Sequence, residues 1–156
     1  ENKLALCSAI AATKSKEIIE SRGHKTKNIS NFPMIVSDKI ESVLKTKEMV
    51  KILHSLNLLQ DIERLKSRKP RTGKSLLRGR GTKIGKSVLF VVSKAEKLSK
   101  ACNGIPGVDV QTPKNLSVLD LAPGADPIRL TVYSTTALKE IGKIKSPHLE
   151  LMVSMN

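Results

Sequence analysis

The sequence predicts an α/β fold in which helices cover a parallel sheet. Short apolar segments typical of buried strands alternate along the chain with segments that repeat apolar residues at helical spacing. The clearest strand is the continuous apolar run at residues 88–92, as expected for a strand buried on both faces. Strands separated by helices are parallel in such proteins, because each helix returns the chain to the same edge of the sheet.

The first half of the chain contains three predicted helices and one predicted strand. The helices show helical spacing of alanine and larger apolar residues and lie at residues 4–22, 46–56 and 57–65. Gly23 is a natural stop for the first helix. Asn57 and Gln60 resemble a capping box at the start of the third. The short apolar segment 32–36 predicts the strand between them.

The second half contains three predicted strands, at residues 87–92, 108–110 and 128–133. Ser93 and Glu96 match the Ser-x-x-Glu capping box and predict a helix that ends near Asn103. A short turn is expected at residues 118–121, and a last helix at 135–141. We therefore expect one domain over residues 1–142, followed by a C-terminal tail at 143–156 without a clear pattern.

Composition excludes several classes of function. The chain has 156 residues, and 39% of them are hydrophobic, enough for the core of one domain. Its three aromatic residues are too few for rows of stacked bases on single-stranded nucleic acid. The longest apolar run is far shorter than the roughly 20 residues of a membrane span. Cys7 and Cys102 are too far apart in sequence for a metal knuckle and form no disulfide framework.

The positive charge is concentrated in one internal segment. Of the 28 lysines and arginines, 11 lie between Arg64 and Ala95, and none of the 14 acidic residues does. A charge run is usually a solvated face or a flexible tail, but this one lies between a predicted helix and the clearest strand. Four glycines interrupt it. Such dense like charge repels itself unless a polyanion neutralises it, so we expect a loop at 67–86 that binds the phosphates of structured RNA or DNA.

No motif for catalysis or for a cofactor is found. Gly73-Lys74-Ser75 and Gly85-Lys86-Ser87 end like phosphate-binding loops, but Arg68 and Arg80 stand where that motif requires a glycine. None of the three histidines has a metal partner at a suitable spacing: His24, His54 and His148. We therefore expect that the protein is not an enzyme and that it binds no cofactor, metal or small-molecule substrate. The segment Lys45-Thr46-Lys47 leaves two interpretations open, a phosphate contact at a helix start and simple solvated lysines.

Several segments along the chain together form a recognisable pattern. They are 4–13, Arg22-Gly23-His24, Lys45-Thr46-Lys47-Glu48, Asp61-Ile62-Glu63-Arg64, 68–74 with 78–80, 86–92, 105–110, 121–125 and 129–133. In this order they resemble the archaeal and eukaryotic branch of the fourth large-subunit ribosomal protein family, and the resemblance covers about 140 of the 156 positions.

This resemblance implies a three-layer α/β/α domain with a small, mostly parallel four-stranded sheet. It also implies a structural, cytoplasmic role on the ribosome, in contact with large-subunit ribosomal RNA and neighbouring large-subunit proteins, and a part in subunit assembly and translation. Family members carry an upstream segment with a loop that reaches the peptide exit tunnel. This chain begins after that segment, so no residue here is expected to carry the tunnel function.

The sequence thus favours a ribosomal RNA-binding protein without catalytic activity. An RNA-processing or RNA-modifying enzyme with a basic substrate arm is the alternative, but it requires a ligand set that the sequence does not offer. A membrane-surface module is a third hypothesis, which the glycines and Pro70 within the basic run disfavour because they prevent an amphipathic helix. The residues expected to contact RNA are Arg68, Lys69, Arg71, Gly73, Lys74, Arg78, Gly79, Arg80, Gly81, Lys83 and Lys86.

Overall fold

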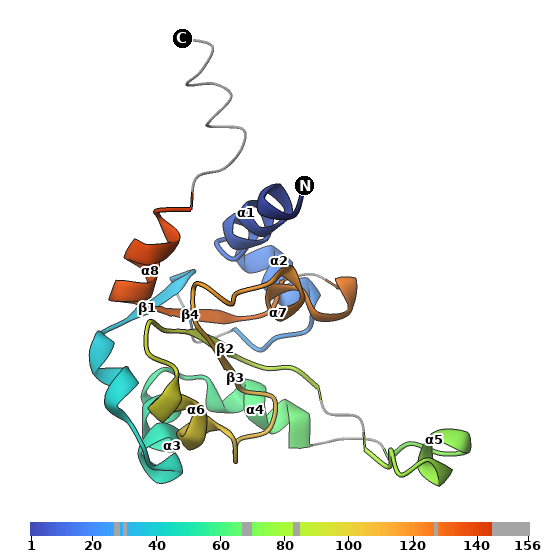
Figure 1. Ribbon diagram of the computed structural model, residues 1–156. Coiled ribbons are helices and arrows are strands. Elements are labelled where there is room, and N and C mark those ends of the chain that lie inside the picture. Colours follow the sequence, from blue (N-terminus) through green and yellow to red (C-terminus); the bar gives the residue numbers. More distant parts are fainter. Residues whose placement is uncertain (27–28, 30, 67–69, 83–84, 127, 145–156) are drawn as a thin grey trace.

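The fold is built on a four-stranded sheet in which all neighbouring strands are parallel, in the order β1-β4-β2-β3. The computed structural model describes residues 1–26, 29, 31–66, 70–82, 85–126 and 128–144. Its strands are Met34–Val36 (β1), Leu89–Val91 (β2), Asp109–Gln111 (β3) and Thr131–Ser134 (β4) (Figure 1). The predicted α/β class and small sheet are confirmed, and each predicted strand is present: β1, β2 and β4 are shorter than predicted, and β3 is shifted by one residue.

Helices connect the strands. They are Asn2–Ala12 (α1), Lys16–Ser21 (α2), Thr46–Ser55 (α3), Leu59–Lys66 (α4), Lys74–Leu77 (α5), Glu96–Cys102 (α6), Val118–Leu121 (α7) and Thr135–Ile141 (α8), with 3-10 turns at Asp38–Ser42 (η1) and Pro123–Ala125 (η2). Between β1 and β2 the chain passes through α3 and α4, and β4 then inserts between those two strands.

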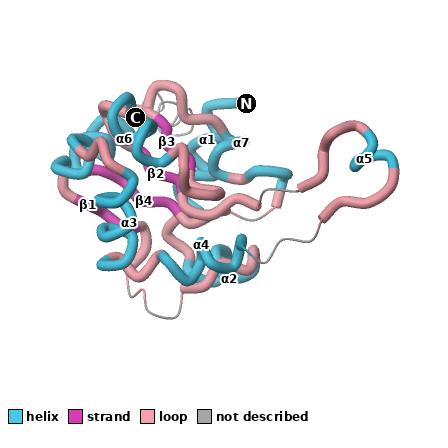
Figure 2. Tube along the Cα trace, turned by 90° about the horizontal axis from the view of Figure 1, so that it is seen from below, coloured by secondary structure: helices cyan, strands magenta, loops and turns pink. Residues whose placement is uncertain are grey.

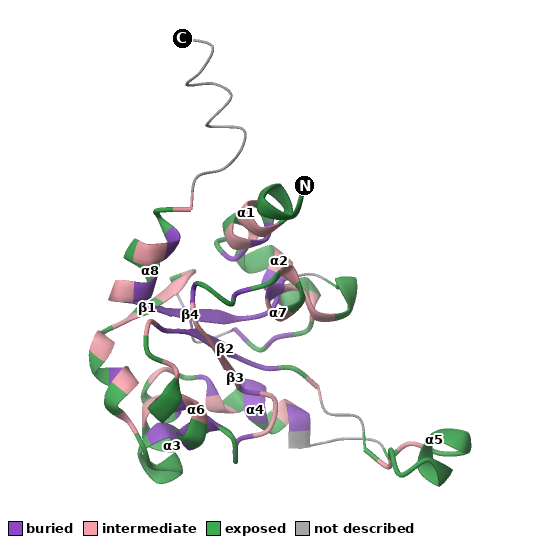
Figure 3. Ribbon diagram, in the orientation of Figure 1, coloured by how far each residue is buried: buried purple, intermediate pink, exposed green. Residues whose placement is uncertain are grey.

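Two hydrophobic cores lie on the two faces of the sheet, because successive side chains of a strand point to opposite faces. Phe90 and Val132 belong to the first core, together with apolar residues of α3, α4 and α6. Leu89, Val91 and Tyr133 belong to the second, with residues of α1, α7 and α8. Figure 2 shows the same arrangement from below, and Figure 3 shows that buried residues follow the two central strands, β2 and β4. The described elements therefore form the three layers that the resemblance implied.

The first predicted helix, residues 4–22, is divided into α1 and α2. Thr13 interrupts it: its hydroxyl donates to the carbonyl oxygen of Ile10 at 2.6 Å, and a turn follows before α2. Such a bond from a side chain to a preceding carbonyl competes with continued helix. Gly23 follows α2 with φ +89°, as expected for a helix stop.

The predicted capping box of Ser93 and Glu96 is wrong. Helix α6 begins at Glu96 with Ala95 as its N-cap, and no side chain caps it. The Ser93 hydroxyl instead donates to Glu140 of α8 at 2.9 Å. Tertiary partners of Ser93 thus replace the predicted cap of α6. A complete capping box is found elsewhere, where Ser117 and Asp120 cap α7. Asn57 does not begin α4 either; it has φ +58°, and the helix starts at Leu59.

Candidate nucleic-acid interface

The basic segment between α4 and β2 leaves the body of the protein as a projecting loop. In both views α5 stands apart from the sheet and its covering helices (Figures 1 and 2). The two legs of the loop meet at an antiparallel bridge between Pro70 and Thr82, where the Arg71 amide donates to the carbonyl oxygen of Gly81 at 2.8 Å. We call residues 70–82 the basic loop tip. Its cations are therefore presented together, away from the acidic residues of the body.

Helix α5 closes the basic loop tip with a Schellman motif. The amide of Gly79 donates to the Leu76 carbonyl at 3.0 Å, and the amide of Arg80 donates to the Ser75 carbonyl at 3.0 Å. Gly79 has φ +72°, the left-handed conformation that this motif requires at the residue after the cap. The sequence predicted only a loop at 67–86 and not this turn, although a glycine just after a short helical segment is the usual signal of a Schellman motif.

Four of the predicted RNA-contacting cations lie within the basic loop tip. Lys74, Arg78 and Arg80 are exposed, and Arg71 is half-buried. None of the four forms an ion pair with another described residue. Of the predicted glycines, Gly73 and Gly79 have positive φ, whereas Gly81 does not. Arg68, Lys69 and Lys83 lie outside the described residues.

Lys86 lies on the body of the protein rather than in the tip. Its Nζ is 2.8 Å from Oδ2 of Asp109, at the start of β3. Burial on its own raises the pKa of the Asp109 carboxyl, but hydrogen bonds from Lys86 and Arg129 outweigh it and hold the pKa below its ordinary value. Lys86 thus has an internal partner, and its side chain is still 44% exposed.

Arg129 anchors the strand on which the loop ends. Its side chain is 1% exposed. The guanidinium donates to the carbonyl oxygens of Ser87, Val88 and Gly107 at 2.8–2.9 Å and to Asp109 at 2.6 Å. Because the strands are parallel, these groups meet at the edge of the sheet where β2, β3 and β4 begin. This role of Arg129 was not predictable from the sequence, since three of its four partners are backbone atoms.

A second buried cluster joins both ends of the loop. The Asp61 carboxylate on α4 accepts hydrogen bonds from the His24 ring at 2.9 Å, the Ser87 hydroxyl at 2.5 Å and Arg64 at 3.1 Å. Burial is the largest single influence on the Asp61 pKa and raises it, but these bonds together with the electrostatic attraction of His24 lower the pKa well below its ordinary value. Asp61 precedes the loop and Ser87 follows it, so the cluster fixes the two ends side by side.

The opposite edge of the sheet, where the strands end, is acidic. Asp38 accepts hydrogen bonds from the Thr136 amide at 3.0 Å and the Thr135 hydroxyl at 2.7 Å. Glu41 accepts from the Ser93 amide and the Ser134 hydroxyl, each at 2.9 Å. Ligands of open α/β sheets often bind at this edge. Here the carboxylates hold the N-terminus of α8 and the turn after β2, so they serve the packing of the fold.

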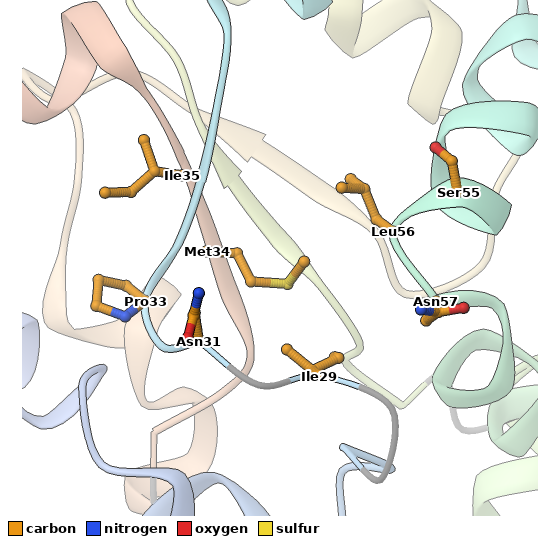
Figure 4. Close-up of a pocket in the computed structure, with 8 residues that line it drawn as sticks. All are labelled: Ile29, Asn31, Pro33, Met34, Ile35, Ser55, Leu56 and Asn57. Atoms are coloured by element: carbon orange, nitrogen blue, oxygen red, sulfur yellow. The ribbon is translucent and has the colours of Figure 1, made fainter.

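An uncharged pocket lies beside the edge strand β1. Its lining comes from the segment around β1 and from the end of α3 (Figure 4): Ile29, Asn31, Pro33, Met34, Ile35, Ser55, Leu56 and Asn57. These side chains include no acid, base or thiol, and the Ser55 hydroxyl donates to the Ile52 carbonyl at 2.8 Å. The lining therefore contains no base that would activate this hydroxyl as a nucleophile. The Met34 side chain points into the space between the strand and the helix end.

Within the described part of the chain, no three His, Cys, Asp or Glu side chains gather closely enough to hold a metal ion. The helices that the structure describes include none with the length and apolar character needed to cross a membrane.

The fold and the projecting basic loop define an α/β protein with a cluster of cations on one exposed element, and these cations form no ion pair with another described residue. The model of the ribosomal protein L4/L1 family matches residues 1–144. The chain therefore belongs to this family, as its collinear segments indicated, and this membership agrees with the expectation that it is not an enzyme.

Three archaeal relatives illustrate the relationship, and each is named large ribosomal subunit protein uL4. The protein from Haloquadratum walsbyi is 44% identical over 142 residues, covering 90% of this chain and 56% of the relative. That from Methanococcus aeolicus is 44% identical over 144 residues, covering 92% and 57%. That from Sulfurisphaera tokodaii is 42% identical over 145 residues, covering 92% and 54%. The chain thus spans little more than half the length of these relatives.

Proposed function

We propose that the protein containing this chain is a structural component of the large ribosomal subunit and binds large-subunit ribosomal RNA through the loop at residues 67–86. Its partners are that RNA and neighbouring large-subunit proteins, and it acts on ribosomes in the cytoplasm, in subunit assembly and translation. The contacts are assigned to the residues that the sequence singled out: Arg68, Lys69, Arg71, Gly73, Lys74, Arg78, Gly79, Arg80, Gly81, Lys83 and Lys86.

The observation that carries this proposal is the unneutralised charge of the basic loop tip. Arg71, Lys74, Arg78 and Arg80 have no acidic partner among the described residues, while Asp61 and Asp109 neutralise cations at the base of the loop. Phosphate groups supply the missing counter-charge, and release of their condensed cations favours binding. Arginine adds a planar fork of donors that matches two phosphate oxygens.

Recognition is assigned mainly to the shape and backbone of the RNA. The two fully buried aromatic residues, Phe90 and Tyr133, belong to the cores on the two faces of the sheet, and the basic loop tip contains no aromatic residue. Stacking of splayed bases on aromatic rings is the usual route to sequence-specific reading of single-stranded RNA. A loop without such rings acts through phosphate and sugar contacts instead.

The test is the salt dependence of binding to large-subunit ribosomal RNA transcribed in vitro. Each phosphate contact contributes about 0.7 to 0.9 to the slope of log affinity against log salt. We expect the fourfold alanine variant of the basic loop tip to flatten that slope by roughly 3 to 4 units. The residues replaced are Arg71, Lys74, Arg78 and Arg80.

The matched control replaces four exposed lysines of the body by alanine, which changes the net charge equally. These lysines are Lys51, Lys97, Lys100 and Lys139 on α3, α6 and α8. The control is expected to keep a slope close to that of the unmodified chain. Two results contradict the assignment of the loop as the contact surface. In the first, the loop variant and the unmodified chain have equal slopes; in the second, the loop variant and the control are flattened equally.

A further inference from the structure

Two exposed leucines lie in the middle of the basic loop tip, where charged residues are expected. Leu77 is 86% exposed and Leu76 is 54% exposed. Leu77 has the highest exposure among the exposed large hydrophobic residues that the structure describes. Single exposed leucines are common on protein surfaces. Leu77 differs from them because it lies on an ordered turn among cations that form no ion pair with another described residue.

The two leucines differ in their surroundings. A methyl group placed on Gly81 would lie 3.4 Å from Cδ1 of Leu76, so Leu76 packs against the returning leg of the loop. Leu77 remains in solvent although it is the last residue of α5. The hydrogen bonds of Gly79 and Arg80 to the preceding carbonyls fix the turn directly after it. Leu77 is therefore an apolar group presented on an ordered support.

We propose that Leu77 makes an apolar contact with a base face or ribose of ribosomal RNA, between phosphates held by Lys74, Arg78 and Arg80. This inference rests on the proposed function and assigns the apolar part of the same interface. Apolar side chains that enter nucleic-acid grooves and contact bases are known in proteins that bind by shape. Leu77 supplies such a surface in a loop without aromatic residues.

The charge around Leu77 favours RNA over a protein surface as the molecule that contacts it. The charged residues nearest to Leu77 in sequence are all cations, and no acid occurs between Arg64 and Ala95. A protein surface would need a matching group of carboxylates around an apolar pocket. In RNA, phosphates surround every base and ribose, so the apolar and the charged contacts come from the same molecule.

An apolar contact and a phosphate contact leave different signatures in a salt titration. Loss of a phosphate contact changes the slope of log affinity against log salt, whereas loss of an apolar contact lowers affinity at every salt concentration and leaves the slope unchanged. We expect Leu77→Ala to weaken binding of the 156-residue chain to in vitro transcribed large-subunit RNA by about 5- to 20-fold, with an unchanged slope.

Two variants serve as controls. Leu77→Met keeps an apolar side chain of similar volume and is expected to bind within about threefold of the unmodified chain. Leu119→Ala removes a leucine that is 74% exposed on α7, on the body of the protein, and is expected to have no effect. Alanine and methionine are both strong helix formers, so neither replacement at position 77 disrupts α5.

Binding of Leu77→Ala within twofold of the unmodified chain overturns the inference. A loss seen only in assembled large subunits, and not with RNA alone, also overturns it, because it assigns Leu77 to a protein neighbour. In either case the proposed function stands if the fourfold alanine variant of the basic loop tip has a flatter salt slope than the unmodified chain. If the two slopes are equal, the result contradicts the proposed function itself.

Discussion

Arg129 and Asp109 form a 2.6 Å ion pair where β3 and β4 begin, and the same carboxylate accepts Lys86 at 2.8 Å. The buried arginine also binds three backbone carbonyls of the segments that lead into β2 and β3. This pair thus joins the end of the basic loop to three of the four strands. It couples the stability of the sheet to the position of the loop.

Replacement of Arg129 by alanine is expected to destabilise the fold by about 3 to 5 kcal/mol. The Ser87 carbonyl loses its donor, Asp109 keeps only Lys86, and the Val88 and Gly107 carbonyls keep only their backbone donors. Urea unfolding followed by circular dichroism measures the change. Arg78→Ala, which removes an exposed arginine of the loop, is expected to change stability by less than about 0.5 kcal/mol. A loss below 1 kcal/mol for the Arg129 variant would show that this network contributes little.

The Asp61 cluster predicts a loss of stability in acid. The folded state lowers the Asp61 pKa, so the carboxylate contributes stability that is fully present above the ordinary carboxyl pKa of about 4. That contribution is lost as the pH falls through the lower pKa of the folded state. The unfolding free energies of the unmodified chain and of Asp61→Asn are measured from pH 7 down to pH 2. We expect the difference between them to shrink as the pH falls. A constant difference across this range contradicts the prediction.

Gly107 is expected to tolerate no side chain. It has φ +75°, and a methyl group there would lie 2.2 Å from Cδ1 of Leu65 and 2.7 Å from the Gly85 carbonyl oxygen. Gly107→Ala should therefore cost roughly 2 to 4 kcal/mol, from backbone strain and the clash together. Gly23→Ala is the control, because Gly23 has φ +89° and open space around it. It should cost only about 1 kcal/mol; equal losses in chemical denaturation would rule out the clash.

The two cysteines are expected to differ in reactivity. Burial raises the pKa of the Cys102 thiol to about 12, and its side chain packs in the core beneath the sheet. Cys7 on α1 is half-exposed. Iodoacetamide at pH 8 should label Cys7 in the native chain and both cysteines in guanidinium, as peptide mass spectrometry will show, because only the thiolate reacts. Rapid native labelling of Cys102 would contradict the described packing.

Much of the fold was predictable because the strands have a distinctive composition. Residues 88–92 are apolar throughout, and β2 is buried on both faces, so a local pattern was sufficient. The helix boundaries were less predictable where tertiary contacts decide them. Ser93 has the right spacing for a cap, yet Glu140 and Thr136 of α8 engage its hydroxyl. A single sequence does not show partners so distant along the chain.

The candidate interface was predictable in its charge and only partly in its structure. The acid-free segment marks the loop in the sequence. The Schellman turn that presents Leu77 was missed because the glycines were interpreted as positions that allow a close approach to RNA and a positive φ, and not as the stop of a short helix. The support from Arg129 was missed because backbone carbonyls, which every residue carries, are its main partners.

A cryo-electron microscopy reconstruction of the large ribosomal subunit containing this protein is the most direct test. We predict density for the basic loop tip against ribosomal RNA, with Arg71, Lys74, Arg78 and Arg80 at ion-pair distance from phosphates. A reconstruction in which residues 70–82 extend into solvent, with no nucleotide near these four side chains, would contradict the account.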